Sequence, residues 1–178
     1  INNGNVSNTG EMGDIGAVYA GGCFGNLRTD NITVTNCDNY GVVSFTGNSH
    51  GACLLGGVVS DVRGVATFTN CDNFAKGNIT DSPTSKTKVS KLGGICADFQ
   101  HIDSTASKRS TFTDCTNYAK IQADAGAASS SSDLNSDNTL TRVGGGFGNL
   151  QATTSYDIEL NNVDNHGSLV LNFATCNS

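Results

Sequence analysis

The chain has 178 residues, including 22 glycines and only one proline, and its net charge is −6. Its Lys and Arg residues are scattered singly, which excludes nucleic acid and anionic membrane surfaces as expected partners. No run approaches the roughly 20 apolar residues of a membrane span, so we expect no membrane insertion. Apolar residues alternate with Thr, Ser and Asn, and this pattern predicts an all-β protein.

Two short motifs alternate along the chain. The first reads AGGCFGNLR, LGGVVSDVR, LGGICADFQ and VGGGFGNLQ, and the second reads TVTNCDNYG, TFTNCDNFA, TFTDCTNYA and ELNNVDNHG. A partial copy of the second motif, NNGNV, lies near the start. Such a regular internal repeat predicts a stack of similar coils. We therefore expect one repeat domain over residues 1–178, with repeats at 1–36, 37–70, 71–114 and 115–162 and a partial repeat at 163–178.

Each repeat is expected to contain three strands and one bend. A strand runs through the glycine pair (20–26, 54–59, 92–96, 143–147), and a second contains the Thr-rich segment (32–37, 66–71, 111–115, 158–163). An Asn bend follows, then a short strand (42–45, 77–80, 121, 169–171). Residues 81–91 and 124–138 fall outside the pattern and are polar or rich in Ser and Ala. We expect both to be flexible surface loops at the same corner of the stack.

Asn and Gly occupy fixed positions in the repeats. The invariant Asn residues are Asn2, Asn39, Asn73, Asn117 and Asn165, and the glycine pairs are Gly21-Gly22, Gly56-Gly57, Gly93-Gly94 and Gly144-Gly145. Asn tolerates the left-handed conformation, so it is the expected bend residue. Stacked Asn side chains also form ladders of amide hydrogen bonds. An invariant glycine pair indicates positive φ or a close backbone approach.

The seven cysteines cannot all form intrachain disulfides, because their number is odd. Cys37, Cys71 and Cys115 share one position of the second motif, and Val163 fills it in the fourth repeat. A position that accepts both residue types is a small buried apolar site, so these thiols, with Cys23 and Cys96, are expected to fill the core. Cys53 and Cys176 remain candidates for pairing. No CxxC or Cys/His spacing is present, and we expect no metal and no cofactor.

The search for catalytic residues finds none. The three histidines occupy different places in the repeat: His50, His101 and His166. Asp recurs in two positions, at Asp61 and Asp98 and at Asp38, Asp72 and Asp164, but Asn26, Asn149 and Thr116 replace it in other repeats. This exchange favours turns over acid–base chemistry, and the spacing lacks the density of a calcium loop. The VGGGFG segment has no following helix and no Lys-Ser/Thr pair, so it is not a phosphate loop.

Two surface features leave further alternatives open. Thr33/Thr35, Thr67/Thr69 and Thr111/Thr113 are expected to form two outward rows of hydroxyls, at a spacing of ~4.8 Å. Similar flat arrays occur in ice-binding β-solenoids, although β-propensity alone explains Thr on an outer face. Three N-x-S/T sequons, at Asn5, Asn31 and Asn78, are glycosylation sites only if the source modifies secreted proteins.

The Asn39-Tyr40-Gly41-Val42-Val43 segment, followed by Leu55-Gly56-Gly57-Val58, resembles the GLUG-type repeats of bacterial surface proteins. Similar Gly- and Asn-rich repeats occur in exoproteins of gut Bacteroidetes. The resemblance extends to the equivalent segments of each repeat, and it implies a β-solenoid in an exported protein of adhesive or structural type. No catalytic residue can be carried over. The present repeats are longer than GLUG units, so each can be one wide coil or two narrow ones.

We therefore predict a right-handed parallel β-helix with four full repeats and a partial fifth. The expected function is a non-enzymatic extracellular or cell-surface module, structural or adhesive, that assembles into a fibre through its open ends. Its partners would be copies of itself or flanking repeats, with surface glycans as a further possibility. One alternative is a carbohydrate-active β-helix enzyme, which would need a cluster of carboxylates and basic residues that the sequence does not reveal. Ice binding is the other.

Overall fold

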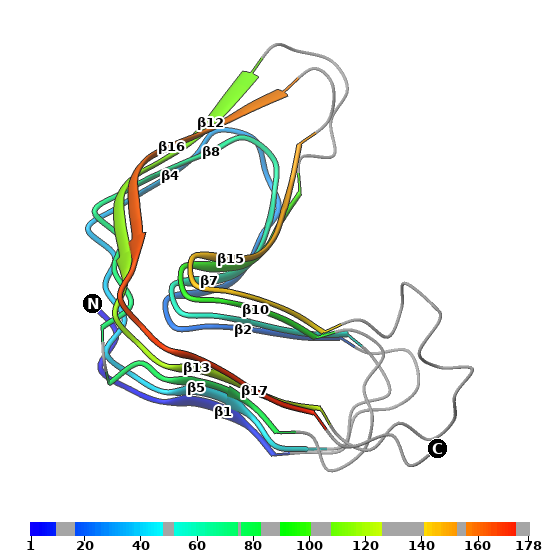
Figure 1. Ribbon diagram of the computed structural model, residues 1–178. Helices are drawn as coiled ribbons and strands as arrows, with labels where there is room; N and C mark the ends of the chain where they lie inside the picture. Colours follow the sequence, from blue (N-terminus) through cyan, green and yellow to red (C-terminus); the bar gives the residue numbers. More distant parts are fainter. Residues whose placement is uncertain are drawn as a thin grey trace.

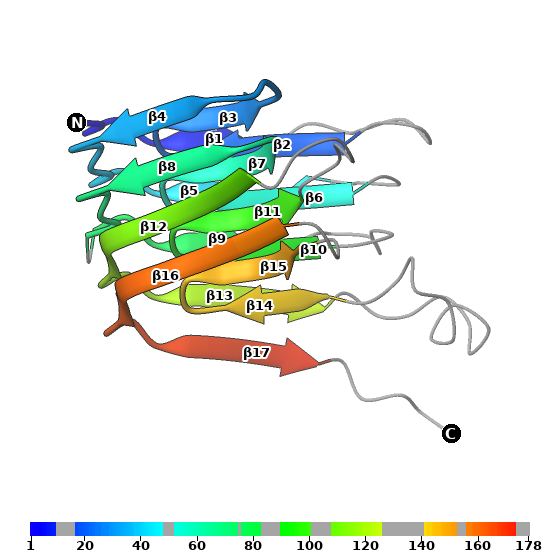
Figure 2. The same cartoon turned by 90° about the horizontal axis from the view of Figure 1, so that it is seen from above.

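The computed structural model shows an all-β parallel solenoid of four stacked coils (Figures 1 and 2). It describes residues 1–9, 17–47, 52–74, 76–82, 90–100, 108–125, 141–152 and 156–173. The predicted fold class, with four full repeats and a partial fifth, is confirmed. Each repeat is one wide coil of four strands. Right-handed winding stays a prediction.

Every coil repeats the same four strands. The first partial coil contributes β1 (Val6–Asn8). Coil 1 contains β2 (Ala17–Gly21), β3 (Phe24–Leu27), β4 (Ile32–Thr35) and β5 (Val43–Phe45). Coil 2 contains β6 (Ala52–Gly56), β7 (Val59–Arg63), β8 (Ala66–Thr69) and β9 (Ile79–Asp81). Coil 3 contains β10 (Ser90–Gly93), β11 (Cys96–Gln100), β12 (Lys108–Asn117) and β13 (Ile121–Ala125), and coil 4 contains β14 (Arg142–Gly144), β15 (Phe147–Gln151), β16 (Tyr156–Asn165) and β17 (Leu169–Phe173).

Equivalent strands of successive coils pair in parallel and form four sheets, numbered here in the order in which a coil visits them. Sheet 1 contains β2, β6, β10 and β14, and sheet 2 contains β3, β7, β11 and β15. Sheet 3 contains β4, β8, β12 and β16, and sheet 4 contains β1, β5, β9, β13 and β17. The pairing aligns identical positions of the repeats, for example Gly56 with Gly93 and Thr67 with Thr111.

The glycine pair lies between two strands, whereas the sequence analysis placed it inside one. Sheet 1 ends at the first glycine, the chain turns back, and sheet 2 begins two residues after the second glycine. Because of this turn, the interior contains two apolar clusters. One lies between sheets 2 and 3 and includes Phe68, Phe99 and Phe112. The other lies between sheets 1 and 4 and includes Phe45 and Leu55.

The glycine turn packs against the Asn corner on the opposite side of the same coil. A Cβ added to Gly94 would lie 2.3 Å from Cγ of Asn117 and 2.0 Å from the carbonyl oxygen of Gly145 in the next coil. A Cβ on Gly93 would lie 1.9 Å from the carbonyl oxygen of Cys96. None of the eight paired glycines has positive φ, so close backbone approach is the correct explanation and positive φ is wrong. The two motifs of each repeat therefore meet inside each coil and separate its two cores.

The five corner Asn residues form a continuous amide ladder along the solenoid. Their Nδ2 atoms donate to the Oδ1 atoms of the next coil at 2.8, 2.9, 2.8 and 2.7 Å, in the order Asn2, Asn39, Asn73, Asn117 and Asn165. Each Nδ2 also donates to a backbone carbonyl of its own corner, as Asn39 does to Gly41. The corner residue stays out of the left-handed region, which corrects the prediction that it is the bend residue. The left-handed residues lie three positions earlier, at Asn36, Asn70, Asp114 and Asn162.

The two predicted loops are bounded by ordered strands. Asp81 ends β9, and Ser90 and Lys91 begin β10, so these three residues are not part of a loop. Asp124 likewise lies within β13. Residues 83–89 and 126–138 lie outside the described residues.

Candidate functional site: a charged row between sheets 1 and 2

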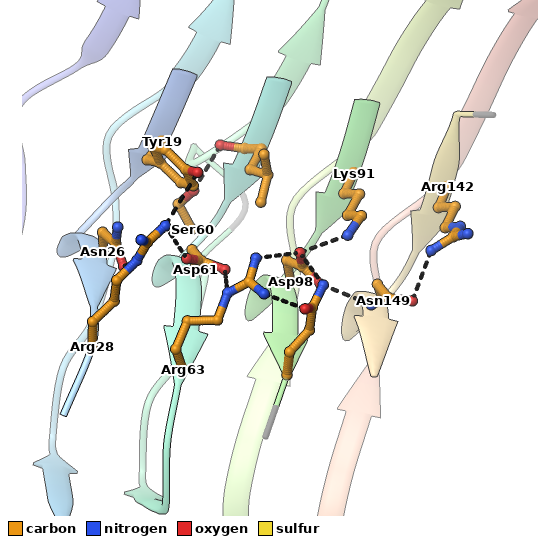
Figure 3. Close-up of polar contacts among 12 residues, drawn as sticks. Tyr19, Asn26, Arg28, Ser60, Asp61, Arg63, Lys91, Asp98, Arg142 and Asn149 are labelled. Carbon is orange, nitrogen blue, oxygen red and sulfur yellow. Dashed lines mark hydrogen bonds and ion pairs between the residues drawn. The ribbon is translucent and has the colours of Figure 1, made fainter. Parts of the chain in front are cut away.

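Sheets 1 and 2 turn a row of polar side chains toward one another, away from both apolar cores (Figure 3). The row crosses all four coils and follows the solenoid axis. We call it the charged row, and its members are Tyr19, Asn26, Arg28, Asp61, Arg63, Lys91, Asp98, Gln100, Arg142 and Asn149.

Asp61 in β7 joins coil 1 to coil 2. Its Oδ1 accepts a 2.8 Å hydrogen bond from Nε of Arg63, and its Oδ2 lies 3.4 Å from an Arg28 guanidinium nitrogen. Arg28 also reaches Oδ1 of Asn26 and the hydroxyl of Tyr19. Asp61 is fully buried, and this burial raises the pKa of its carboxyl although the Arg63 charge opposes the shift. The carboxylate therefore depends on its arginine partners to remain charged in the interior.

Asp98 in β11 occupies the equivalent position one coil further on and has more partners. Its Oδ2 accepts from Nζ of Lys91 at 2.6 Å and from Arg63 at 3.3 Å, and its Oδ1 accepts from Asn149 at 2.7 Å. Gln100 donates to both carboxylate oxygens and in turn accepts from Arg63. Asp98 thus ties coils 2, 3 and 4 together through charged and amide groups.

The row concentrates positive charge in an acidic chain. It holds four of the ten Lys and Arg residues, Arg28, Arg63, Lys91 and Arg142, against the two carboxylates. Only Arg28 is largely exposed, with 55% of its side chain accessible, whereas Lys91 is 13% accessible. Asp98 accepts five hydrogen bonds on its two oxygens, whereas each Asp61 oxygen accepts one, and both carboxylates are buried beside cations. The arrangement joins coils and leaves Arg28 as its accessible cation.

The sequence analysis missed this cluster. It interpreted Asp61 and Asp98 as turn residues and found no grouping of carboxylates with basic residues; both interpretations are wrong, because the aspartates lie within strands beside Arg63 and Lys91. The available signal was the end of the first motif, where Asn or Asp is followed two positions later by Arg or Gln. Lys91 gave no signal, because it had been assigned to a loop.

The Thr rows lie on sheet 3 with the register that the sequence predicts. Thr33 pairs with Thr67, Thr67 with Thr111, and the hydroxyls of Thr67 and Thr111 lie 3.4 Å apart. In coil 4 the rows end, because Glu159 replaces Thr and pairs with Arg109 at 2.8 Å. The regular array therefore covers three coils only.

A second ladder, which the sequence analysis did not recognise, stacks aromatic rings beside the Asn corner. Tyr40 and Phe74 stack at 4.3 Å, Phe74 and Tyr118 at 5.5 Å, and Tyr118 and His166 at 5.4 Å between ring centroids. The signal was the residue after each corner Asn, which is Tyr, Phe, Tyr and His in the four full repeats. Each ring face is occupied by the next ring, so the inner rings have no free face for stacking on a sugar.

The remaining candidate residues are placed as follows. Cys71 and Cys115 are fully buried and Cys37 is half-buried, while Val163 packs against the same core. Cys53 is a buried free thiol, and Cys176, His50 and His101 lie outside the described residues. Of the sequon residues, Asn5 accepts from the Val42 amide and Asn78 from the Lys120 amide, and Asn31 is exposed with a φ of 61°. Glycosylation at these three sites stays a prediction.

Asp81 places a carboxyl between two apolar residues of one column of sheet 4. It pairs with Phe45 and Ala123, is 2% exposed, and its Oδ1 is the single buried side-chain N or O atom without a hydrogen-bond partner among the described residues. Burial raises the pKa of its carboxyl from 3.8 to about 6, opposed by hydrogen bonds from Ser90 and Cys53, while Asp124 adds to the rise. Asp81 is thus a buried carboxyl whose charged form is disfavoured.

Replacing this carboxyl should stabilise the protein at neutral pH. The folded state holds the Asp81 proton more tightly than the unfolded state, so stability is lost as pH rises from about 4 to 6 and the full cost remains above that. Asp81→Asn is expected to raise the free energy of unfolding at pH 7 by on the order of 3 kcal/mol and to change little near pH 3.5. Urea unfolding at both pH values measures this difference. Asp157→Asn, at an exposed carboxylate, is the control, and an equal gain at both pH values would contradict the assignment.

Searches for a metal site, a membrane-spanning helix and similar known proteins all gave negative results for the described residues or the sequence. In the described part of the chain, no three His, Cys, Asp or Glu side chains form a group that could hold a metal ion. The described residues likewise include no helix with the length and apolar character needed to cross a membrane. No protein-family model, no curated protein and no solved structure matches this chain.

Proposed function

We propose that this protein is a non-enzymatic structural module of an extracellular β-solenoid, which assembles end to end through its C-terminal coil. The extracellular setting and the adhesive role come from the resemblance to GLUG-type repeats. Assembly through the end is supported by the apolar side chains of coil 4.

The observation that carries the proposal is the exposure of four leucines of coil 4 whose partners in coil 3 are buried. Leu160 pairs with Phe112 and Leu169 with Ile121; both partners are fully buried, whereas each leucine is 45% exposed. Leu150 and Leu171 show the same contrast, at 38% and 45%. At the other end, Val34 in the column of Leu160 is only 6% exposed. Among the described residues, these leucines of coil 4 are therefore uncovered, whereas Val18, Ile32 and Val34 of coil 1 are buried.

The strand edges fit a further coil of the same kind. β14, β15, β16 and β17 each lie at the edge of their sheet, and their backbone groups are free to pair with added parallel strands. The partner that we propose for these edges is coil 1 of a second copy of the protein. Its β2, β3 and β4 form the opposite edges of sheets 1, 2 and 3.

Sheet 4 adds one requirement to this contact. It has five strands and the other sheets have four, because β1 precedes coil 1. If β2, β3 and β4 of the incoming copy pair with β14, β15 and β16, its β1 falls on the place that β17 already occupies. One of these two strands must move aside. β1 is short and pairs through three residues, so it is the strand that we expect to be displaced.

Two alternatives have less support. Acid–base catalysis on a polysaccharide would need an accessible carboxylate, and both aspartates of the charged row are buried and paired with Arg or Lys. Ice binding would need an extended flat array, and the Thr rows stop at Glu159. The polysaccharide enzyme and the ice-binding face remain proposals with their own tests, namely activity on a polysaccharide panel and thermal hysteresis.

Electron microscopy and sedimentation of the full chain test the proposal. We expect linear assemblies that grow with concentration, Leu160→Lys to reduce them to the 18.3 kDa monomer, and deletion of residues 1–8 to increase them. Asn161→Lys is the matched control, because this neighbour in β16 is exposed on the other face of the strand. A wild-type protein that stays monomeric at every concentration would overturn the proposal.

A further inference from the structure

Four of the cysteines form one cluster at the edge of the core between sheets 2 and 3. Cys37, Cys71 and Cys115 follow the left-handed residue of successive coils, and they stand two positions before the paired corner residues Asn39, Asn73 and Asn117. Cys23 packs against the same core from the glycine turn. Stacking of the coils separates equivalent Cα atoms by ~4.8 Å, within the range of about 4.4–6.8 Å that a disulfide spans.

The sulfur contacts divide the cluster into two pairs. The side chains of Cys71 and Cys115 are in contact, and so are those of Cys23 and Cys37, while all four thiols are free. Sγ of Cys23 lies 3.5 Å from the carbonyl oxygen of Asp38, the residue that follows Cys37. Cys53 lies in the other core, beside Asp81. Cys96 lies in the same core as the cluster, at the start of β11, and it has no described contact with another cysteine.

We propose that Cys71 with Cys115, and Cys23 with Cys37, are two disulfide sites that form when the protein folds in an oxidising medium. The first bond joins coil 2 to coil 3, and the second joins the glycine turn of coil 1 to the end of its Thr segment. This pairing uses all four clustered cysteines. A bond between Cys37 and Cys71 would instead leave Cys23 and Cys115 without partners.

The chemistry is thiol–disulfide exchange with a small disulfide such as oxidised glutathione. The Cys71 thiolate attacks the glutathione disulfide and releases one glutathione thiolate, which takes up a proton. The Cys115 thiolate then attacks the mixed disulfide and releases the second glutathione, so two electrons pass from the protein to the oxidant. Both thiols are fully buried in the folded protein, so the exchange is expected during folding.

Peptide mapping distinguishes the pairings, because trypsin separates all the cysteines except Cys37 and Cys53. These two share residues 29–63, and fragment masses of the linked peptide show which of them carries the alkyl group. The full chain is refolded from denaturant with reduced and oxidised glutathione, free thiols are alkylated under denaturing conditions, and the chain is digested without reduction. We expect residues 64–76 linked to 110–120, and residues 1–28 linked to 29–63, with Cys53 and Cys96 alkylated. A link between 29–63 and 64–76, or folded protein with both pairs alkylated, would overturn the proposal.

Two variants each replace a cysteine with the valine found at the equivalent position of another coil. Cys115→Val copies Val163 of coil 4 and should abolish only the link between 64–76 and 110–120. Cys96→Val copies Val59 of coil 2 and should leave both links intact. The assigned pairs would be contradicted if Cys96→Val lost both links. They would also be contradicted if Cys115→Val kept the link between 64–76 and 110–120. The outcome is independent of end-to-end assembly, which involves coil 4 leucines.

Discussion

Gly94→Ala is expected to destabilise the protein by more than about 3 kcal/mol, enough to unfold a marginally stable coil stack. The added methyl would lie 2.0 Å from the carbonyl oxygen of Gly145 and 2.3 Å from Cγ of Asn117. Both obstacles are fixed, since one is backbone and the other belongs to the amide ladder. Relief would require the glycine turn to move away from the corner, which would open the contact between the two cores. Urea unfolding followed by circular dichroism measures the loss.

The matched control for this prediction is Gly146→Ala. Gly146 directly follows a glycine pair, yet its nearest neighbour for an added Cβ is a Val163 methyl at 3.7 Å, an ordinary contact. Equivalent positions in the other coils hold Cys23, Val58 and Ile95. We expect little change in this variant. Equal losses in the two variants would show that glycine is needed for flexibility and not for close approach.

Asn73→Asp is expected to have the second largest effect, because it keeps the size of the side chain and removes only its donor. Nδ2 of Asn73 donates to Oδ1 of Asn117 at 2.8 Å and to the Gly77 carbonyl at 3.2 Å. A carboxylate would face these two acceptors in a fully buried position, where an unpaired charge is strongly disfavoured. We expect a loss of roughly 3–5 kcal/mol at pH 7, the cost of an uncompensated buried charge.

The pH dependence identifies the cause. Protonation restores a donor, and the buried site holds that proton more tightly than the unfolded chain does, so the variant should recover stability as pH falls toward 4. Asn165→Asp is the control, since the last ladder residue is exposed and its Nδ2 donates only to Gly167 among the described contacts. A loss in Asn73→Asp that does not change with pH would assign the effect to packing and not to the missing donor.

These two predictions test one structural unit, the contact between the glycine turn and the Asn corner. A coil stack gains stability mainly from neighbouring coils, so a defect in coil 2 or 3 disturbs two interfaces and a defect in coil 4 disturbs one. This difference explains why the central Gly94 and Asn73 are the informative positions. It also agrees with the exposed leucines of coil 4, which lack the cover that a further coil would give.

The fold class, the number of coils and the residues that stack on one another could all be predicted from the sequence. These follow from periodicity, because parallel stacking without insertions inside the strands aligns equal positions of successive repeats, as with Thr67 and Thr111. The path of the chain around one coil could not be predicted and became visible only in the three-dimensional structure. The turn at the glycine pair depends on contact with the Asn corner on the opposite side of the coil, and the charged row depends on sheets 1 and 2 facing one another. A repeat period carries no information on those contacts. The same period is compatible with one strand that runs through Gly21 and Gly22 or with two strands joined by a turn there.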